Sequence, residues 1–266
     1  MKIYLKLMAA LLLFSGSAPA AASSGAGGPA EADTSLIKEL TVLPSLPPEP
    51  DQLTVIPGRG LFVNVGDGEY MALDRGRCPD FGQFMVTENL WYDQLLACDG
   101  RFLVRSGTDV YAVDSAGCTP VARFDTPCFR LFAAGDSAFH AVVYADEGSV
   151  LYSYRPAAAE LTLELRLPDD ILQVEATAGG YAFITPHALY FADGRELHRL
   201  FDTEEPLTAV AAVGAGLLFS TAGALYLYDG EETLPLMSGP FVDLFYDDGR
   251  TYMVFADGRI CYSDIF

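Results

Sequence analysis

The stretch ALYLYDG, residues 224–230, decides the fold, because the chain repeats its pattern several times. In each copy, two apolar or aromatic residues stand four and three positions before a charged residue. The other copies are YMALD (70–74), VYAVD (110–114), VLYSYR (150–155), ALYFADG (188–194) and ICYSD (260–264). Aligned on the final charged residue, successive copies are 40, 41, 38, 36 and 35 residues apart. A recurring period of this size indicates a repeat fold.

Each period reads as four short β-strands separated by turns. In the fifth period the strands are expected in LTAVAAV (207–213), LLFST (217–221), ALYLYDG (224–230) and TLPLMS (233–238). These segments are rich in β-branched and aromatic residues, and Gly, Asp or Pro residues separate them, as in hairpins. The chain after its N-terminal segment shows no sustained apolar period of 3.6 residues, so helix is expected to be scarce.

Four-stranded units with a period of about 35 to 45 residues are similar to the blades of a β-propeller. On period and strand pattern, residues 35–266 resemble a six-bladed β-propeller, an all-β fold of four-stranded antiparallel blades. The last copy ends before a fourth strand, so the N-terminal segment SLIKELTVLP (35–44) is expected to complete the last blade and close the ring. A β-sandwich would not explain the spacing, whereas a seven-bladed ring with one degenerate blade remains an alternative. The signatures of sialidase and WD40 propellers are missing, so the resemblance implies no active site.

The N-terminal segment resembles a secretory signal. Two basic residues, Lys2 and Lys6, precede a short apolar run, and small residues including Ala18-Pro19-Ala20 follow it. This layout predicts a signal peptide over residues 1–20, a flexible leader over 21–34 and a single domain over 35–266. The apolar run is too short to span a bilayer, so we expect an exported protein without a membrane span, in the periplasm or outside the cell.

The chain is strongly acidic, with 16 basic and 36 acidic residues and a net charge of −20. Loss of two lysines with the signal peptide would leave 14 basic residues against 36 acidic ones, a charge of −22. Such a chain repels phosphate backbones, which excludes nucleic acid as a favoured partner. A hydrophobic content of 51% nevertheless provides a core, so this is no disordered acidic tail.

Five cysteines follow the signal segment: Cys78, Cys98, Cys118, Cys128 and Cys261. In an oxidising compartment the first four could form two disulfides, and their pairing stays open. Cys261 is the expected odd thiol, because it stands where the other copies mostly have tyrosine. No CxxC pair or calcium-loop pattern occurs, so no metal or cofactor is expected, and the recurrent Asp-Gly pairs are interpreted as turns.

The loops offer the best candidate site. Strands alternate in direction within a blade, so fourth-to-first loops and second-to-third turns should gather at one end. Five of the six fourth-to-first loops contain an acid, and a surface of one charge attracts partners of the other. The candidate binding residues are Trp91, Asp93, Asp125, Asp169, Asp170, His187, Asp202, Glu204 and Glu205. The alternative interpretation is solvated turn acids, with Trp91 packed between blades.

The sequence contains no nucleophile elbow and no paired zinc histidines. We therefore predict a non-enzymatic interaction module that binds a protein or basic peptide of the cell envelope through its acidic loop face. The alternative function is a carbohydrate-active or lactone-cleaving enzyme that uses carboxylates of the central funnel, with or without a divalent metal. A third interpretation, a structural subunit of an envelope assembly, predicts an exposed apolar patch.

Overall fold

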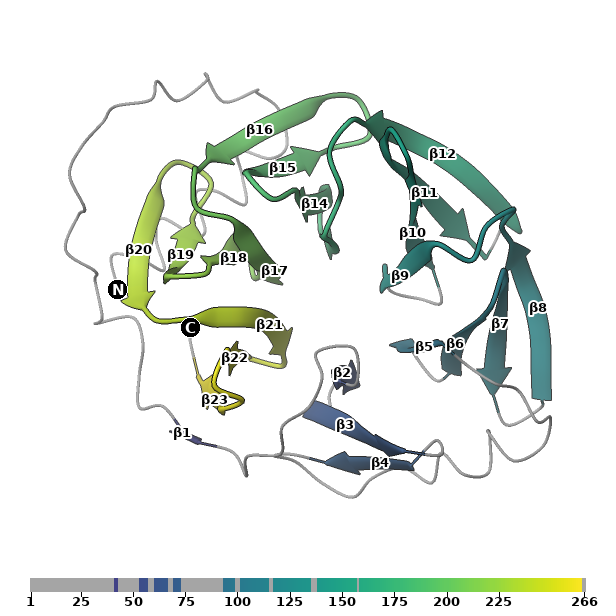
Figure 1. Ribbon diagram of the computed structural model, residues 1–266, viewed down its shortest axis with the longest axis horizontal. Coiled ribbons are helices and arrows are strands. Elements are labelled where there is room, and N and C mark those ends of the chain that lie inside the picture. The colour runs from purple at the N-terminus through teal and green to yellow at the C-terminus, as the bar shows by residue number, and fades with distance from the viewer. Residues whose placement is uncertain are drawn as a thin grey trace. The chain divides into compact units, whose positions relative to one another are not determined.

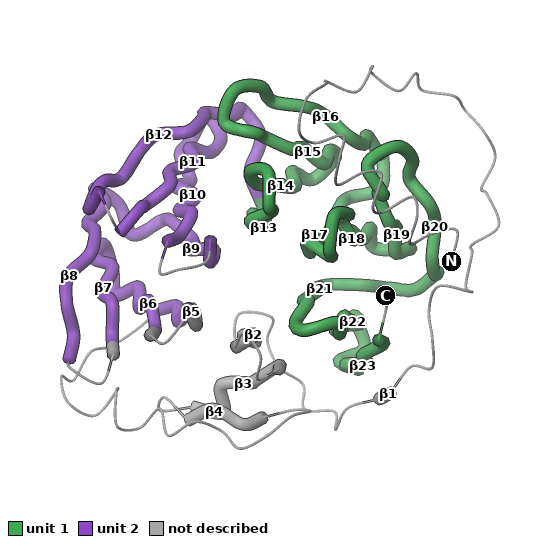
Figure 2. Tube along the Cα trace, turned by 180° about the vertical axis from the view of Figure 1, so that it is seen from behind, with its two compact units in different colours: residues 1–45, 172–266 green, residues 46–171 purple. Residues whose placement is uncertain are grey.

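The computed structural model describes nine segments of the chain, and within them every regular element is a β-strand (Figure 1). The segments are residues 41–42, 53–56, 60–66, 69–72, 93–98, 101–114, 117–134, 138–156 and 158–264. The predicted signal peptide and leader lie outside the described residues, as does most of residues 35–44. The chain forms two compact units, residues 1–45 with 172–266 (unit 1) and residues 46–171 (unit 2) (Figure 2). A single domain over residues 35–266 stays a prediction.

Unit 1 holds three four-stranded antiparallel sheets of the β-propeller blade type. In two of them, four consecutive strands pair in chain order. The first contains β13 (Gln173–Thr177), β14 (Gly180–Ile184), β15 (Ala188–Ala192) and β16 (Leu197–Asp202). The second contains β17 (Leu207–Val213), β18 (Gly216–Thr221), β19 (Ala224–Tyr228) and β20 (Thr233–Ser238). The third contains β21 (Phe241–Asp247), β22 (Arg250–Phe255), β23 (Ile260–Ser263) and β1 (Thr41–Val42).

Strand β1 is the one element taken from the other end of the chain. It pairs antiparallel with β23, with Thr41 opposite Tyr262 and Val42 opposite Cys261. The N-terminal strand therefore adds the fourth strand to the last sheet, as predicted, over the two residues that the structure describes. Closure of a ring by this pairing stays a prediction.

Unit 2 holds two four-stranded antiparallel sheets and one three-stranded sheet. The three-stranded sheet contains β2 (Leu53–Ile56), β3 (Gly60–Gly66) and β4 (Glu69–Ala72). The next contains β5 (Gln94–Cys98), β6 (Arg101–Ser106), β7 (Asp109–Asp114) and β8 (Gly117–Arg123). The last contains β9 (Phe129–Ala133), β10 (Phe139–Ala145), β11 (Gly148–Arg155) and β12 (Glu160–Leu167).

The predicted count of six four-stranded blades is wrong: the described residues form five. The sheet β2–β3–β4 has three strands, and the segment that would supply its fourth, residues 73–92, lies outside the described residues. The period of the repeat indicated a copy here without showing whether its outermost strand forms.

The repeated phrase is the third strand of each sheet, as predicted. Its first apolar position is fully buried at Val110, Leu151, Leu189, Leu225 and Ile260, each 0% exposed. In four sheets the ladder between third and fourth strands shifts register at one place, Val110/Tyr111, Leu151/Tyr152, Leu189/Tyr190 and Leu225/Tyr226. The pair of apolar and tyrosine residues thus faces a β-bulge, which increases the local twist of the outer strand.

Consecutive sheets within a unit pack face to face through apolar side chains. In unit 1, Ala211 and Leu225 of one sheet share a core with Leu244 and Met253 of the next. In unit 2, Val110 shares a core with Leu131. Aromatic residues at or just after the end of a fourth strand add contacts to this core. Phe201 on β16 lies 5.7 Å from Tyr226 of the next sheet, and Phe124, which follows β8, lies 5.9 Å from Tyr152 of the next sheet, between ring centroids. The repeated columns therefore fill the space between sheets, as the sequence pattern predicts.

Candidate functional site

The fourth-to-first loops and the second-to-third turns lie at the same end of each sheet. In unit 1, the amide of Thr203 in such a loop donates to the carbonyl of His187 in such a turn at 3.0 Å. In unit 2, the amide of Phe124 donates in the same way to the carbonyl of Thr108 at 2.9 Å. These backbone bonds fix the acidic loops against the turns, so the predicted grouping of loops is confirmed within each unit.

Four of the predicted site residues lie in unit 2 and are exposed: Asp93, Asp125, Asp169 and Asp170. The carboxylate of Asp93 accepts a hydrogen bond from the amide of Gly107 at 2.8 Å, so it also caps a turn. The loop that carries Asp169 is held by Ser149, whose hydroxyl donates to the carbonyl of Asp169 at 2.8 Å and accepts from the amide of Ile171 at 3.0 Å. Trp91 lies outside the described residues.

The other four predicted site residues lie in unit 1 and are also exposed: His187, Asp202, Glu204 and Glu205. Asp202 forms an ion pair with Arg199. The carboxylate of Glu205 lies over the turn of the following sheet, because a Cβ added to Gly223 would stand 2.6 Å from its Oε1 atom. One loop therefore presents three carboxylates beside an exposed histidine. A binding role for these residues stays a prediction.

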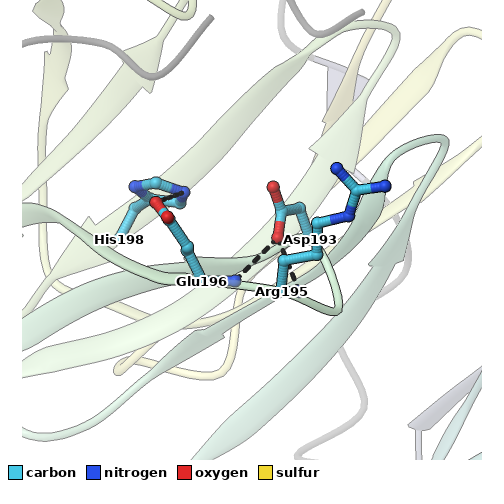
Figure 3. Close-up of polar contacts among 4 residues, drawn as sticks. All are labelled: Asp193, Arg195, Glu196 and His198. Atoms are coloured by element: carbon cyan, nitrogen blue, oxygen red, sulfur yellow. Dashed lines mark hydrogen bonds and ion pairs between the residues drawn. The ribbon is translucent and has the colours of Figure 1, made fainter. Parts of the chain in front are cut away.

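Three aspartates of Asp-Gly pairs within the described residues, Asp193, Asp229 and Asp257, stabilise turns, as predicted. Figure 3 shows one case, in which the Asp193 carboxylate accepts hydrogen bonds from the amides of Arg195 and Glu196 at 2.8 and 2.9 Å. These two bonds hold the pKa of Asp193 below its usual range. Asp229 repeats the arrangement with the amides of Glu231 and Glu232, both at 3.0 Å. Gly194 has a φ of 83°, which favours glycine.

The sequence analysis missed Glu175, which is the most perturbed carboxyl group of the described residues. It lies half-buried on β13, and neither β14 nor β17 beside that strand contains a charged residue. The pKa of Glu175 is raised from 4.5 to about 8: burial is the largest cause, a hydrogen bond from Gln173 opposes the rise, and the negative charge of Asp243 adds to it. The Nε2 atom of Gln173 donates to Oε1 of Glu175 at 3.1 Å. The signal available in the sequence was the charged residue itself, because the matching first strand β17 contains none.

Two glutamines join neighbouring first strands by the same pair of hydrogen bonds. The side chain of Gln173 on β13 donates to the carbonyl of Val210 on β17 at 2.8 Å and accepts from its amide at 3.0 Å. In unit 2, Gln94 on β5 does the same with Leu131 on β9, with both bonds at 2.8 Å. Each glutamine thus satisfies a backbone donor and acceptor at the edge of the next sheet. The Nε2 atom of Gln173 donates both to Val210 and to Glu175, so the contact between the sheets is linked to the ionisation of Glu175.

The remaining candidate groups of the sequence have structural roles. His140 is buried, its Nδ1 lies 2.9 Å from the hydroxyl of Ser153, and burial followed by the nearby charge of Arg155 lowers its pKa to about 4. It is therefore a packed, neutral histidine. Cys261 is a buried thiol, 2% exposed, and burial raises its pKa. Cys118 and Cys128 are thiols as well, so the expectation of two disulfides among the first four cysteines is wrong.

Among the described residues, no three His, Cys, Asp or Glu side chains converge in a way that could hold a metal ion. The same part of the chain contains no helix long and apolar enough to cross a membrane.

No protein-family profile and no curated protein matches this sequence. Several solved structures share its fold. The extracellular domain of BT4673 from B. thetaiotaomicron, assigned as a hybrid two-component system, is 12% identical with a TM-score of 0.50, over 65% of this chain and 28% of that chain. BBS1N in complex with ARL6DN is 12% identical with a TM-score of 0.50, over 76% and 73%. A protein assigned as a gluconolactonase is 11% identical with a TM-score of 0.48, over 84% and 88%.

These identities show a likeness of fold alone. This chain spans less than a third of the BT4673 chain that it matches. Together with the sheets described above, the comparison supports an all-β propeller arrangement of four-stranded antiparallel blades.

Proposed function

We propose that this protein is an exported, non-enzymatic β-propeller that binds a basic protein or peptide of the cell envelope through its acidic loop ends. The observation that carries the proposal is the exposure of all eight predicted site residues that lie within the described segments, seven of which are carboxylates. They occur in loops that hydrogen bonds fix against neighbouring turns. In this proposal, the pairing of β1 with β23 also closes the propeller.

Charge supports a basic partner. The net charge of −20 repels anionic surfaces and attracts cationic ones at long range. The loop 202–205 contains three acids and a single ion-paired arginine, Arg199, beside it. Exposed carboxylates on ordered loops give attraction and faster association more than they give tight binding. The partner is therefore expected to add contacts of another kind.

The proposal predicts salt-dependent binding that depends on the loop acids. The probe is a fluorescein-labelled oligolysine peptide, and its anisotropy is measured at about 50 mM and about 500 mM NaCl. The double variants Glu204→Lys/Glu205→Lys and Asp169→Lys/Asp170→Lys should each weaken binding. The control Glu196→Lys/Glu231→Lys changes the net charge equally but lies in turns at the opposite end of the sheets, and it should bind more tightly than either. Equal weakening by all three variants would show that net charge alone attracts the probe, which contradicts a site at the loop ends.

Export has a separate test. Mass spectrometry of the mature protein, isolated from cells that produce the full chain, should find an N-terminus near residue 21. A retained Met1 would contradict the exported state.

The second candidate is the carbohydrate-active or lactone-cleaving enzyme, and Glu175 favours it. Glu175 keeps its proton to about pH 8 and lies near the carboxylate of Asp243. A protonated acid beside an ionised carboxylate is the arrangement that general acid catalysis uses. The test is hydrolysis of p-nitrophenyl glycosides and simple lactones by the wild type and by Glu175→Gln. Turnover that Glu175→Gln abolishes would favour the enzyme; turnover absent from the wild type, or unchanged in the variant, would exclude this role for Glu175.

A further inference from the structure

The outer edge of β12 is an open binding edge. In the sheet β12–β11–β10–β9, the strands β12 and β9 are the two edges. The edge of β9 is occupied by the glutamine contact from β5, since Gln94 binds the backbone of Leu131. No strand within the described segments pairs with the other side of β12. An unpaired strand of eight residues extends over about 26 Å and can pair with another extended chain.

Two of the other fourth strands, β8 and β20, have a feature that blocks such pairing, whereas β12 and the shorter β16 do not. Proline lacks the backbone donor that a new strand would need, and it stands in β8 as Pro120 and in β20 as Pro235. Strand β12 has no proline. Its Leu163 is 45% exposed, and the one other exposed large apolar residue of the described chain is Leu197 on β16, at 44%. Exposed leucine on an unblocked edge is costly unless something covers it.

Two depressions lie along β12 and supply sockets for side chains. One, of about 530 Å³, is lined by Arg166 and Leu167 of β12 and by the acidic turn Asp146-Glu147. The second, of about 220 Å³, is lined by Leu161 of β12 together with Tyr152 and Asp125. Its remaining lining includes Arg123, which lies 3.6 Å from the carboxylate of Asp109. Each socket therefore combines an apolar wall with exposed carboxylates.

We propose that β12 binds an extended segment of a partner protein as an added β-strand, with alternating apolar and basic side chains. The backbone of the segment pairs with the open edge, an apolar side chain covers Leu163, and basic side chains reach the carboxylates of the two sockets. Adding a strand to an exposed edge gives affinity through main-chain bonds, and the side-chain sockets give specificity. This inference names the partner of the proposed function and rests on it. Charge selects a basic segment over a second copy, because two chains of net charge −20 repel one another.

The test uses the full mature chain and a labelled peptide of about eight residues that alternates lysine and valine. A second peptide carries the same side chains with alternate backbone amides N-methylated, which removes the donors needed for strand pairing. Leu163→Lys places a positive charge on the edge, and Leu197→Lys is the matched control on another fourth strand. Urea unfolding checks that both variants fold. Fluorescence anisotropy measures affinity, and hydrogen exchange follows the amides of residues 160–167.

We expect the unmodified peptide to bind and to protect the β12 amides, while the N-methylated peptide and Leu163→Lys each lose about tenfold or more in affinity. Leu197→Lys should bind as the wild type does. Equal binding of both peptides, unaffected by Leu163→Lys, would overturn strand addition and leave the charge-driven function standing. A concentration-dependent dimer that Leu163→Lys abolishes would assign the edge to a second copy and overturn the inference. If neither lysine-containing peptide bound the wild type at low salt, the proposed function would be overturned as well.

Discussion

Replacing Glu175 by glutamine should remove a pH-dependent loss of stability. The folded protein holds the proton of Glu175 up to about pH 8, whereas the unfolded chain releases it near 4.5. Between these values the folded state binds more protons than the unfolded state, so the free energy of unfolding falls as the pH rises through that window. Below pH 4.5 the carboxyl group is neutral in both states, and its ionisation costs nothing.

The size of the effect follows from the difference between the two pKa values. At 1.36 kcal/mol for each pH unit, moving from 4.5 to about 8 gives an upper limit of about 5 kcal/mol. Glu175 is half-buried, so water screens part of this penalty, and we expect about 2 to 4 kcal/mol. Glutamine keeps the shape and the hydrogen-bond acceptor towards Gln173 but carries no charge. The variant should therefore exceed the wild type in stability at pH 8.5 and not at pH 4.5.

The assay is urea unfolding of both proteins at several pH values across this window, followed by the difference between their free energies of unfolding. Other carboxylates titrate in both proteins, so the difference isolates Glu175. Asp243→Asn is the second variant: removing that negative charge should lower the pKa of Glu175 in the folded protein, so the loss of stability ends at a lower pH and is smaller at pH 8.5 than in the wild type. A difference that stays constant from pH 4.5 to 8.5 would refute the assigned ionisation.

Three further outcomes follow from single contacts. Gln173→Ala should lower the free energy of unfolding by about 2 to 3 kcal/mol in urea titrations, because it removes two hydrogen bonds to Val210 and leaves that backbone unsatisfied. Thr251→Val should raise it by about 1 kcal/mol, since the threonine side chain is 0% exposed and its hydroxyl has no hydrogen-bond partner among the described residues. Deleting residues 35–44 removes the strand paired with β23 and should lower the melting temperature measured by circular dichroism; an unchanged melting temperature would contradict a closing role.

The parts of the fold that the sequence predicted are those set by local spacing. The apolar column of the third strand, at Leu189 and Leu225 for example, repeats at a nearly constant period, and burial of that column follows from alternation along a strand. The turn aspartates were predictable for the same reason, because Asp193 acts on amides two and three residues ahead. The number of complete blades was not, since a period counts copies without showing whether each outer strand pairs.

The sequence pattern did not predict the contacts between sheets. Gln94 and Gln173 each bind a residue 37 positions ahead, and nothing in the sequence marks Leu131 or Val210 as their partners. The bulge opposite the tyrosine column also depends on pairing, which residue spacing does not specify. Glu175 was missed because QVEAT fits a strand in every other respect, and the consequence of an acid there depends on the absence of charge in β14 and β17.

The two kinds of acid in this chain suit different tasks. The loop carboxylates, such as Glu204, are exposed to solvent and can attract a basic partner at long range. Glu175 lies where ionisation is costly, so its protonation is coupled to the stability of the fold. Attraction at the loops provides little discrimination between basic partners, because screened charges act without fixed geometry. Discrimination then depends on shape, and in our proposal the edge of β12 with its two sockets supplies it.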